Sequence, residues 1–336
     1  MSPKVFLTGA TGFIGGDFLA SALKAHSDWQ WSCLVRSEEK GKKVAALSPQ
    51  ISLCYGTIDD INLIEEEASN ADIVFHSAAS DDHAASAEAI VRGLKRRNRD
   101  GPAFYIHTSG AFILAHQTLS FGQFGERLDK VFDDWDGIKE LVTMPYSAPH
   151  RNVDKIVLSA GSERIKTAIV APTVVYGVGR GPDKKKWGPL FESFLKSRKV
   201  FMVGKGENIW HNIHVQDLSR LNLLLAEAAA SGGGNATWNQ KGYYLAENGS
   251  YVCGEMLKMA ADILYRKGLV NSPDLEVVPV DQSESVDRWL KIMVGADCQG
   301  VALRARKLLG WKPVMPSFEQ ELEPSLESDA NELGLL

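Results

Sequence analysis

The feature that most constrains this chain is the glycine-rich segment near residue 10. Residues 4–16 read KVFLTGATGFIGG, and Gly9, Gly12 and Gly15 recur in it at three-residue spacing. An apolar, β-rich stretch precedes the first glycine, and an apolar pattern with helical spacing follows the second. Glycines let the backbone turn sharply and let a phosphate approach without a Cβ in the way, and a helix start adds unpaired N–H groups. The segment predicts a strand, turn and helix that bind a pyrophosphate; the alternative is a glycine turn without a ligand.

The composition excludes several classes of partner. The chain has 336 residues, 44% of them hydrophobic and 24% charged, which is enough for one large domain or two modest ones. The net charge is −5 and no basic stripe is present, so no nucleic-acid partner is expected. No apolar run approaches the roughly 18 residues of a spanning helix, so no membrane partner is expected either.

The cysteines argue against a metal site and a disulfide framework. The four cysteines are widely scattered and form no Cys-x-x-Cys pair: Cys33, Cys54, Cys253 and Cys298. No metal is therefore expected. A strand is predicted from residue 4 onward, which leaves no room for a secretory signal before it, so a cytoplasmic location is expected.

The first half of the chain alternates between strand and helix patterns. Strands are expected at Lys4–Leu7, Trp31–Val35, Ile51–Tyr55, Ile73–His76, Ala103–Thr108 and Thr167–Ala171. Helices are expected between them at Gly12–Ala25, Glu38–Leu47, Ile61–Ala68, Ala84–Arg97 and His150–Glu163. Short apolar strands that alternate with helices predict an α/β fold with a doubly wound parallel sheet, covered on both faces.

The regular alternation of strand and helix patterns ends after about residue 177. Helices are expected at Pro189–Ser197, His214–Ala230 and Val252–Lys267, and a last strand at Tyr243–Ala246. We expect residues 1–176, with 212–248 returning to them, to form a dinucleotide-binding domain. Residues 177–211 and 249–325 are expected to form a smaller substrate-binding region. The acidic end after Pro324 is expected to be disordered.

Six landmarks follow one another in a characteristic order. They are the glycine triplet, His76–Ala79, Thr108–Ser109, Pro172–Gly177, Asn212–Asp217 and Lys307–Pro313. Together they make the chain resemble the extended short-chain dehydrogenase/reductase superfamily, the group of nucleotide-sugar epimerases, dehydratases and dihydroflavonol-type reductases. In style it is most similar to fungal NAD-dependent epimerase/dehydratase-like members. The resemblance covers nearly the whole chain and implies a Rossmann fold that binds a nicotinamide cofactor.

The resemblance implies a catalytic Tyr-x-x-x-Lys pair, which this chain carries in altered form. Aligning Asp154–Leu158 with the family's Glu-x-x-Val-Leu segment puts Tyr146 at the tyrosine position and His150 at the lysine position. In such enzymes the tyrosine exchanges the proton, and the lysine holds the ribose and lowers the tyrosine pKa. We expect Tyr146 to exchange the proton and His150 to contact the ribose, with a charge only when protonated. The alternatives are a loop tyrosine and a solvent-facing histidine.

A second departure from the family pattern lies at the end of the fifth strand. The family places a serine or threonine there to hold the substrate oxygen, but this chain has Gly110 at that position. Thr108 and Ser109 stand one or two residues earlier. We expect one of these hydroxyls, or a water, to take the catalytic role.

The end of the second strand predicts which nicotinamide cofactor binds. NAD-binding members carry an acidic residue there, whereas this chain has Arg36, whose guanidinium suits a 2′-phosphate. We therefore expect NADP(H) rather than NAD(H); the alternative is that Arg36 is a surface residue. The other expected cofactor contacts are Gly9, Thr11, Gly12, Phe13, Ile14, Gly15, Thr57, Ile58, Ala78, Ala79, Pro172, Val174 and Val175, together with His150.

Aromatic residues dominate the region expected to bind the substrate. The candidate lining residues are Phe112, Tyr176, Trp187 and Trp210, with core packing as the alternative. Such residues favour an apolar or ring-bearing substrate over a sugar nucleotide.

We predict an NADP(H)-dependent oxidoreductase that reduces a carbonyl of a small apolar or aromatic metabolite, in secondary metabolism. One alternative is a non-redox isomerase, lyase or cyclase on the same scaffold, because the catalytic pair is degenerate. Another is a catalytically weak sensor that binds NADP(H). The expected partner is a small molecule, and assembly into a homodimer is left open.

Overall fold

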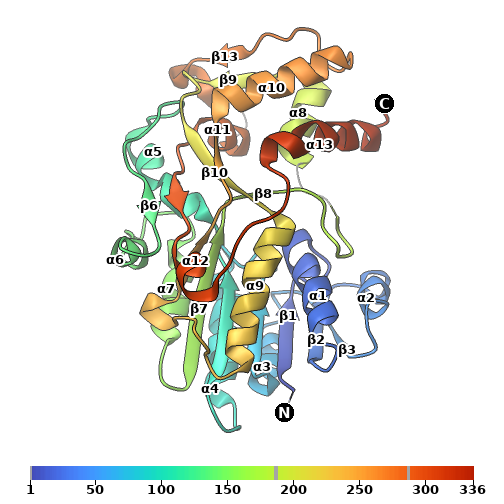
Figure 1. Ribbon diagram of the computed structural model, residues 1–336, viewed down its shortest axis with the longest axis vertical. Helices are drawn as coiled ribbons and strands as arrows, with labels where there is room; N and C mark the ends of the chain where they lie inside the picture. Colours follow the sequence, from blue (N-terminus) through green and yellow to red (C-terminus); the bar gives the residue numbers. More distant parts are fainter. Residues whose placement is uncertain (1, 185–187, 286–287) are drawn as a thin grey trace.

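The computed structural model describes residues 2–184, 188–285 and 288–336. A seven-stranded parallel sheet forms the lower part of the molecule, with strand order β11-β7-β5-β4-β1-β2-β3 (Figure 1). Its strands are β1 (Lys4–Thr8), β2 (Gln30–Val35), β3 (Ile51–Tyr55), β4 (Ile73–His76), β5 (Ala103–Thr108), β7 (Ile165–Pro172) and β11 (Tyr243–Ala246). The predicted doubly wound parallel sheet is confirmed.

Helices cover both faces of this sheet. The helices α1 (Phe13–Ala25) and α9 (Val215–Ala230) pack together on one face (Figure 1). On the other face α4 (Ala84–Arg96) packs between α3 (Ile61–Asn70) and α7 (Arg151–Ala160). The short α2 (Glu38–Ala45) follows β2 and packs at the β3 edge. Short buried strands between two helical layers explain why β4 and β5 read as continuous apolar runs.

A second group of elements lies beyond the carboxyl ends of the parallel strands (Figure 1). A three-stranded sheet has β10 (Ile209–His214) between β8 (Val174–Tyr176) and β12 (Ser250–Val252), and β9 (Phe201–Val203) pairs with β13 (Glu276–Val278). The helices of this group are α8 (Gly188–Ser197), α10 (Cys253–Arg266), α11 (Arg288–Gly295) and α13 (Phe318–Glu332). In open parallel sheets this end is where ligands bind.

Shorter elements fill the side of the molecule near β7 and β11. They are η1 (Ala111–Ala115), α5 (His116–Phe121), β6 (Phe132–Asp133), α6 (Ile138–Val142), η2 (Asn239–Lys241), β14 (Gly300–Val301) and α12 (Arg304–Leu309). The short η3 (Val280–Ser285) follows β13 and packs against α11 in the second group. Both β14 and α12 contact β11 of the large sheet. The segment 249–325 therefore contributes to both regions, and the predicted domain division stays a prediction. None of the helices in the described ranges is long and apolar enough to cross a membrane.

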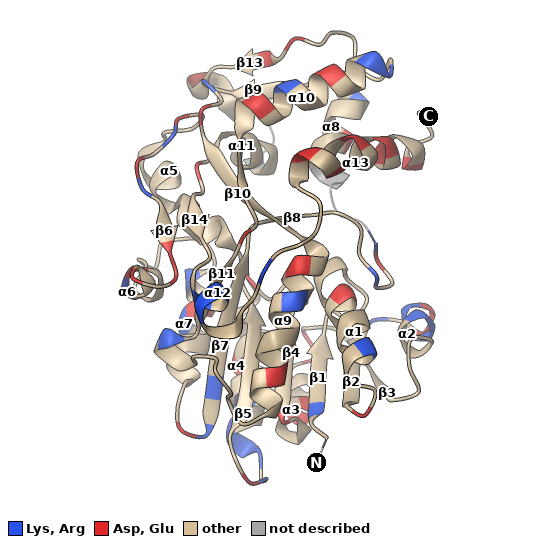
Figure 2. Ribbon diagram, viewed as in Figure 1, with Lys and Arg blue, Asp and Glu red and all other residues tan. Residues whose placement is uncertain are grey.

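The prediction of disorder after Pro324 is wrong, because that segment belongs to α13. Leu322, Leu326 and Ala330 are buried and recur at four-residue spacing, so one face of α13 packs into the protein. Acidic residues alternate with uncharged ones along the rest of this helix (Figure 2). Lys267 of α10 pairs with Glu323 at 3.0 Å and also with Glu327. The acidic composition reflects an exposed, partly ion-paired helix face.

Candidate functional site

The glycine loop joins β1 to α1 and has the geometry of a phosphate cradle. Gly9 has a φ of +82°, and a Cβ there would lie 2.8 Å from the Ser77 carbonyl oxygen. A Cβ on Gly15 would lie 2.5 Å from the Gly9 carbonyl oxygen. Gly12, by contrast, is the N-cap of α1, no side chain caps it, and its Cβ position meets only Gly9 O at 3.4 Å. Gly9 and Gly15 are thus required for packing, while the space beside Gly12 is open to a ligand.

The loop after β4 lies against this cradle. Thr8 Oγ1 accepts hydrogen bonds from the backbone N–H groups of Ser77 (3.1 Å) and Ala78 (3.3 Å). Ala79 follows with a φ of +42°, in the left-handed region. Thr8 Oγ1 also lies 2.7 Å from Nδ1 of His76, whose pKa burial lowers to about 3. Thr8 therefore positions the Ala78–Ala79 turn, and His76 is a neutral packing residue.

The adenosine end of the predicted cofactor site lies at the ends of β2 and β3. Arg36 follows β2 directly, is exposed, and forms no ion pair within the described ranges. Ser37 caps α2 by accepting a hydrogen bond from Lys40 N at 3.3 Å. Thr57 follows β3 in a turn in which its N–H donates to Asp60 Oδ2 at 2.5 Å, and Ile58 follows it. An exposed guanidinium therefore stands directly after β2, the position at which the adenosine ribose is predicted to bind.

A largely apolar cavity of about 390 Å³ lies where the glycine loop, the end of β5 and the β7–β8 segment meet. Seven of the predicted site residues line it: Phe13, Ile14, Phe112, Pro172, Val174, Val175 and Trp210. The remaining lining residues are Asp81, Gly110, Ala111, Thr173, Leu190, Trp289, Leu290 and Met293. The cavity thus joins residues predicted for the cofactor to residues predicted for the substrate.

Aromatic rings form the side of this cavity that is predicted to bind the substrate. The rings of Phe112 and Trp210 are stacked with their centroids 6.3 Å apart, and Trp289 lies 5.9 Å from Phe112. Tyr176 is not part of this wall. It is fully buried, and its hydroxyl donates to Pro316 O at 2.8 Å, so it packs in the core. Trp187, the fourth predicted substrate residue, lies outside the described residues.

Tyr146 does not line the cavity. Its side chain is 70% exposed, and the Lys155 ammonium lies 5.6 Å from its ring centre. Lys155 is itself on the exposed face of α7. Tyr146 is therefore an exposed residue outside the cavity lining, and its catalytic role stays a prediction.

Thr108 and Ser109 are buried at the end of β5 and do not line the cavity. Thr108 Oγ1 is enclosed without a hydrogen-bond partner in the described part of the chain. Ser109 lies near Asp154, which accepts a hydrogen bond from the Tyr243 hydroxyl at 2.9 Å. Burial raises the pKa of Asp154 to about 6, although the neighbouring hydroxyls oppose this shift. It is Gly110, the next residue, that reaches the cavity.

His150 meets this same strand end from the start of α7. It is 6% exposed and has a φ of +60°, which is unusual for a residue other than glycine. Its Nδ1 lies 2.9 Å from Asp82 Oδ1 and 3.8 Å from Asp81 Oδ2. A Cβ on Gly110 would lie 2.9 Å from its Nε2. The imidazole therefore fills the space that a serine or threonine side chain at position 110 would enter.

Sequence reasoning missed both aspartates. The available signal was a pair of acidic residues that directly follows the small-residue turn after β4. Asp81, Asp82 and His150 place ligand atoms within 4.8 Å of one another, and no other such group of possible metal ligands occurs in the described ranges.

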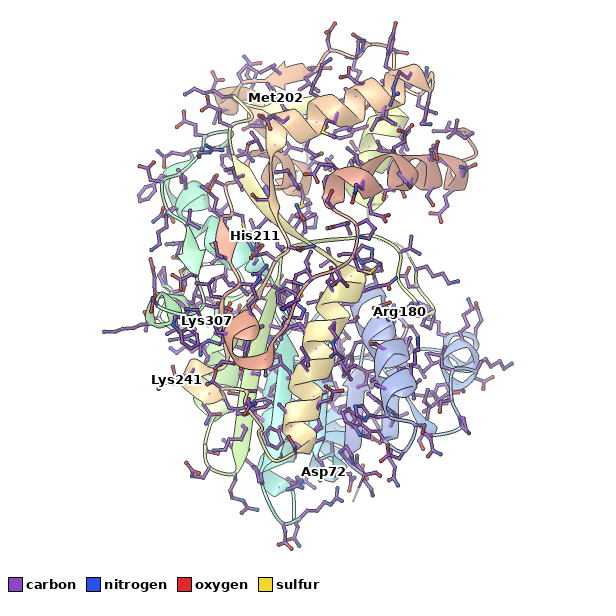
Figure 3. All side chains as sticks on the ribbon, in the orientation of Figure 1. Asp72, Arg180, Met202, His211, Lys241 and Lys307 are labelled. Atoms are coloured by element: carbon purple, nitrogen blue, oxygen red, sulfur yellow. The ribbon has the colours of Figure 1, made fainter. Side chains whose placement is uncertain are left out.

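An ion pair between the half-exposed Arg180 and the buried Asp17 holds the loop after β8 against α1. Arg180 donates to both carboxylate oxygens of the fully buried Asp17, at 3.0 and 2.7 Å, and its backbone N–H donates at 2.6 Å. Figure 3 shows Arg180 beside the N-terminal end of α1. A Cβ on Gly181 would lie 2.4 Å from the Gly16 carbonyl carbon, so the two backbones are in contact. Arg180 thus anchors the loop through its backbone N–H, Nε and Nη2.

Comparison with known proteins identifies the family. The model of the NAD dependent epimerase/dehydratase family matches residues 5–239. The chain belongs to this family. It is 34% identical to Oxidase ucsJ of an Acremonium species over 100% of both chains. It is also 24% identical to a 3 beta-hydroxysteroid dehydrogenase/Delta 5-->4-isomerase of Mycobacterium tuberculosis, over 66% of this chain and 60% of that protein.

Solved structures agree on the fold. A dTDP-glucose 4,6-dehydratase from Streptomyces venezuelae, in complex with NAD, superposes with a TM-score of 0.65 at 17% identity, over 98% of both chains. Vestitone reductase from alfalfa gives a TM-score of 0.59 at 17% identity, over 100% of both chains. The predicted extended short-chain dehydrogenase/reductase resemblance is confirmed. The family uses this NAD(P)-binding scaffold for dehydrogenases, dehydratases and epimerases.

Proposed function

We propose that the protein is an NADP(H)-dependent oxidoreductase that reduces a carbonyl of a small apolar or aromatic metabolite. The observation that carries this proposal is the single cavity shared by Phe13 and Ile14 of the glycine loop and by the aromatic wall of Phe112 and Trp210. A cavity of this kind suits a ring-bearing substrate beside a nicotinamide. The 34% identical relative is named as an oxidase, which favours redox chemistry over the non-redox alternatives.

The residues present fit a dinucleotide cofactor. The uncapped start of α1 and the open space at Gly12 would receive the pyrophosphate. Pro172, Val174 and Val175 would hold the nicotinamide end, because they line the same cavity as the glycine loop. When bound, the cofactor supplies the hydride that reduces the substrate.

The preference for NADP(H) rests on Arg36. An exposed guanidinium without an ion pair in the described ranges can form charge-assisted hydrogen bonds to a 2′-phosphate. Lys40 in the first turn of α2 adds a second positive charge nearby. No acidic side chain follows β2 directly to bind the two ribose hydroxyls of NAD.

The substrate side is proposed to come from segments 177–211 and 249–325. Leu190, Trp210, Trp289 and Met293 belong to these segments and line the cavity. Their apolar character supports an apolar substrate. The predicted cytoplasmic location and small-molecule partner belong to the same proposal.

The test combines cofactor binding with isotope transfer. Purified protein is titrated with NADPH and NADH, and then incubated with NADPH that carries deuterium at the transferable position. The probes for isotope transfer are aromatic ketones, whose alcohol products keep the transferred deuterium on carbon. Reduction of the aromatic diketone phenanthrenequinone is followed by NADPH consumption, because its hydroquinone product keeps no deuterium on carbon. We expect tighter binding of NADPH and deuterium in the alcohol product. Binding of NADH at least as tight as that of NADPH would refute the cofactor assignment. If all deuterium stays in the cofactor while a probe is rearranged, the non-redox alternative replaces the reductase.

A further inference from the structure

We propose that the His150 imidazole, oriented by Asp82, exchanges the proton with the substrate oxygen, in place of the family's tyrosine. This inference rests on the proposed oxidoreductase function. It concerns a different group from the expected Tyr146, which is 70% exposed and does not line the cavity.

The position of Nε2 carries the inference. Gly110 lines the cavity, and the Nε2 atom of His150 lies 2.9 Å from the position that a Cβ on Gly110 would occupy. The family resemblance places the hydroxyl that holds the substrate oxygen at this strand end. Nδ1 is engaged with Asp82 at 2.9 Å, and this is the one hydrogen bond of the ring in the part of the chain that the structure describes. His150 is itself not one of the lining residues, but its Nε2 lies against Gly110, which is. Nε2 is therefore the ring atom that a ligand beside Gly110 would meet.

The hydrogen bond to Asp82 suits the ring for proton exchange. With its Nδ1–H donated to Asp82 Oδ1 at 2.9 Å, a neutral imidazole presents Nε2 as an acceptor. When Nε2 takes up a proton, the carboxylate complements the positive charge, and Asp81 adds a second carboxylate at 3.8 Å. A histidine oriented by a carboxylate is a recurrent acid–base pair on unrelated folds.

The other titratable and charged groups near the ring come from β5 and α7. His107 of β5 is fully buried, and burial holds its pKa well below the usual range, so it stays neutral. Arg151 of α7 donates to the backbone carbonyls of Met144 and Val142. Asp154 bonds Tyr243, one helical turn further along. The Asp81 and Asp82 carboxylates are therefore the charges closest to the imidazole.

The backbone at His150 explains why this side chain, and not Tyr146, reaches the strand end. The left-handed φ of +60° falls at the first residue before α7. The His150 carbonyl accepts hydrogen bonds from Val153 N (3.1 Å) and Asp154 N (3.0 Å), so the helix fixes this residue. A strained residue held by its surroundings is characteristic of functional sites.

The proposed step balances without a further reactant. The carbonyl carbon gains a hydride from the reduced nicotinamide, and the electron pair of the C=O π bond moves to the oxygen. The oxygen then takes the proton from Nε2, and the imidazole becomes neutral. Solvent returns a proton to the ring, whose partner Asp82 is 73% exposed.

The decisive variant is His150→Asn, because asparagine tolerates the left-handed conformation. We expect kcat for reduction of phenanthrenequinone to fall about 10²–10⁴-fold, the range for acid–base groups, with the NADPH dissociation constant changed less than about threefold. The pH dependence of kcat should differ between the wild type and His150→Asn, because only the wild type has an acid–base group at this position. Asp82→Asn should lower kcat about tenfold and displace the pH profile, and Asp81→Asn should have a smaller effect. His26→Gln, at a remote ion pair with Glu227, is the matched histidine control.

Three results would overturn the proposal while leaving the oxidoreductase function intact. The first is a 10²–10⁴-fold loss in Tyr146→Phe together with an effect of His150→Asn on NADPH binding alone. The second is a pH profile that is the same in the wild type and in His150→Asn. The third is loss of activity with a chelator and its recovery with a divalent cation, which would make Asp81, Asp82 and His150 a metal site.

Failure to reduce any probe would count against the proposed oxidoreductase function. A chemical readout tests the role of His150 even in that case. Diethyl pyrocarbonate acylates accessible imidazole nitrogens, and peptide mapping by mass spectrometry locates the product. We expect acylation of His150 that NADP⁺ and an aromatic alcohol together suppress. A His150 that does not react, or that reacts equally with and without these ligands, contradicts an Nε2 that faces the cavity.

Discussion

The Nε2 atom of His150 lies 2.9 Å from the point where a Cβ on Gly110 would stand. This contact connects the two departures from the family pattern, which are separated by 40 positions in the sequence. A serine or threonine at position 110 would collide with the imidazole, and the glycine is what admits the ring. The histidine and the glycine therefore form one altered site in which a ring nitrogen replaces a hydroxyl.

The first prediction concerns this contact. Gly110→Ala should destabilise the protein by about 1–3 kcal/mol, because the imidazole must move away from Asp82 to make room. In a His150→Ala background, Gly110→Ala should destabilise the protein by at least about 1 kcal/mol less than in the wild type, because the imidazole is absent. Urea denaturation of the wild type, both single variants and the double variant measures the coupling. Costs that add to within about 0.5 kcal/mol would show that the two residues do not interact.

The second prediction concerns the choice of cofactor. Arg36→Ala should weaken NADPH binding by about 1–3 kcal/mol, because a charge-assisted contact to the 2′-phosphate is lost, and should leave NADH binding nearly unchanged. Lys43→Ala is a suitable control, since Lys43 is an exposed cation that already pairs with Glu39 at 3.2 Å. Calorimetric titration of both cofactors checks the result. An equal loss for NADPH and NADH would mean that Arg36 does not bind the 2′-phosphate.

The third prediction separates a glycine that binds from a glycine that packs. Gly12→Val should abolish NADPH binding and leave a folded protein, because its Cβ position meets only Gly9 O at 3.4 Å. Gly15→Ala should instead lower the thermal midpoint, because its Cβ would lie 2.5 Å from that same oxygen. Thermal denaturation and cofactor titration of both variants give the comparison. Normal NADPH binding by Gly12→Val would disprove the phosphate-loop assignment.

Local sequence patterns predicted the sheet well but could not predict the altered site. The residues of β4 and β5 are all buried, so each strand appears in the sequence as an apolar run with clear ends. Asp82 and His150 are 68 residues apart, and only the packing of α7 against the β4–α4 loop brings them together. The exposure of Tyr146 likewise depends on the turn that precedes α7, and alignment to a motif does not show the direction of a side chain.

The helix α13 shows the opposite case. The sequence contains the spacing of a buried helix face, but the acidic composition of the segment led to a prediction of disorder. Leu322, Leu326 and Ala330 have the spacing of a buried helix face. Ser317 forms a capping box with Gln320 at the helix start. Both signals stand in the sequence among acidic residues that, taken alone, favour disorder.

The last prediction uses the buried Asp154 beneath the end of β5. Burial raises its pKa from 3.8 to about 6, so the folded state holds a proton that the unfolded state releases above about pH 4. This contribution to stability is fully present below the unfolded-state pKa and is lost as the pH rises through about 6. Between about pH 5 and about pH 8 the wild type should lose about 1 kcal/mol from this group alone.

Asp154→Asn is the matched variant, because its neutral amide still offers an oxygen to the Tyr243 hydroxyl and does not titrate. As the pH rises, the wild type should therefore lose about 1 kcal/mol of unfolding free energy relative to Asp154→Asn. Taking this difference removes the parallel contribution of Asp134, whose pKa burial also raises to about 6. Urea denaturation at several pH values measures it. A difference that stays constant from about pH 5 to about pH 8 would mean that Asp154 is already ionised in the folded protein at the lower pH, with the neighbouring hydroxyls and Arg151 outweighing burial.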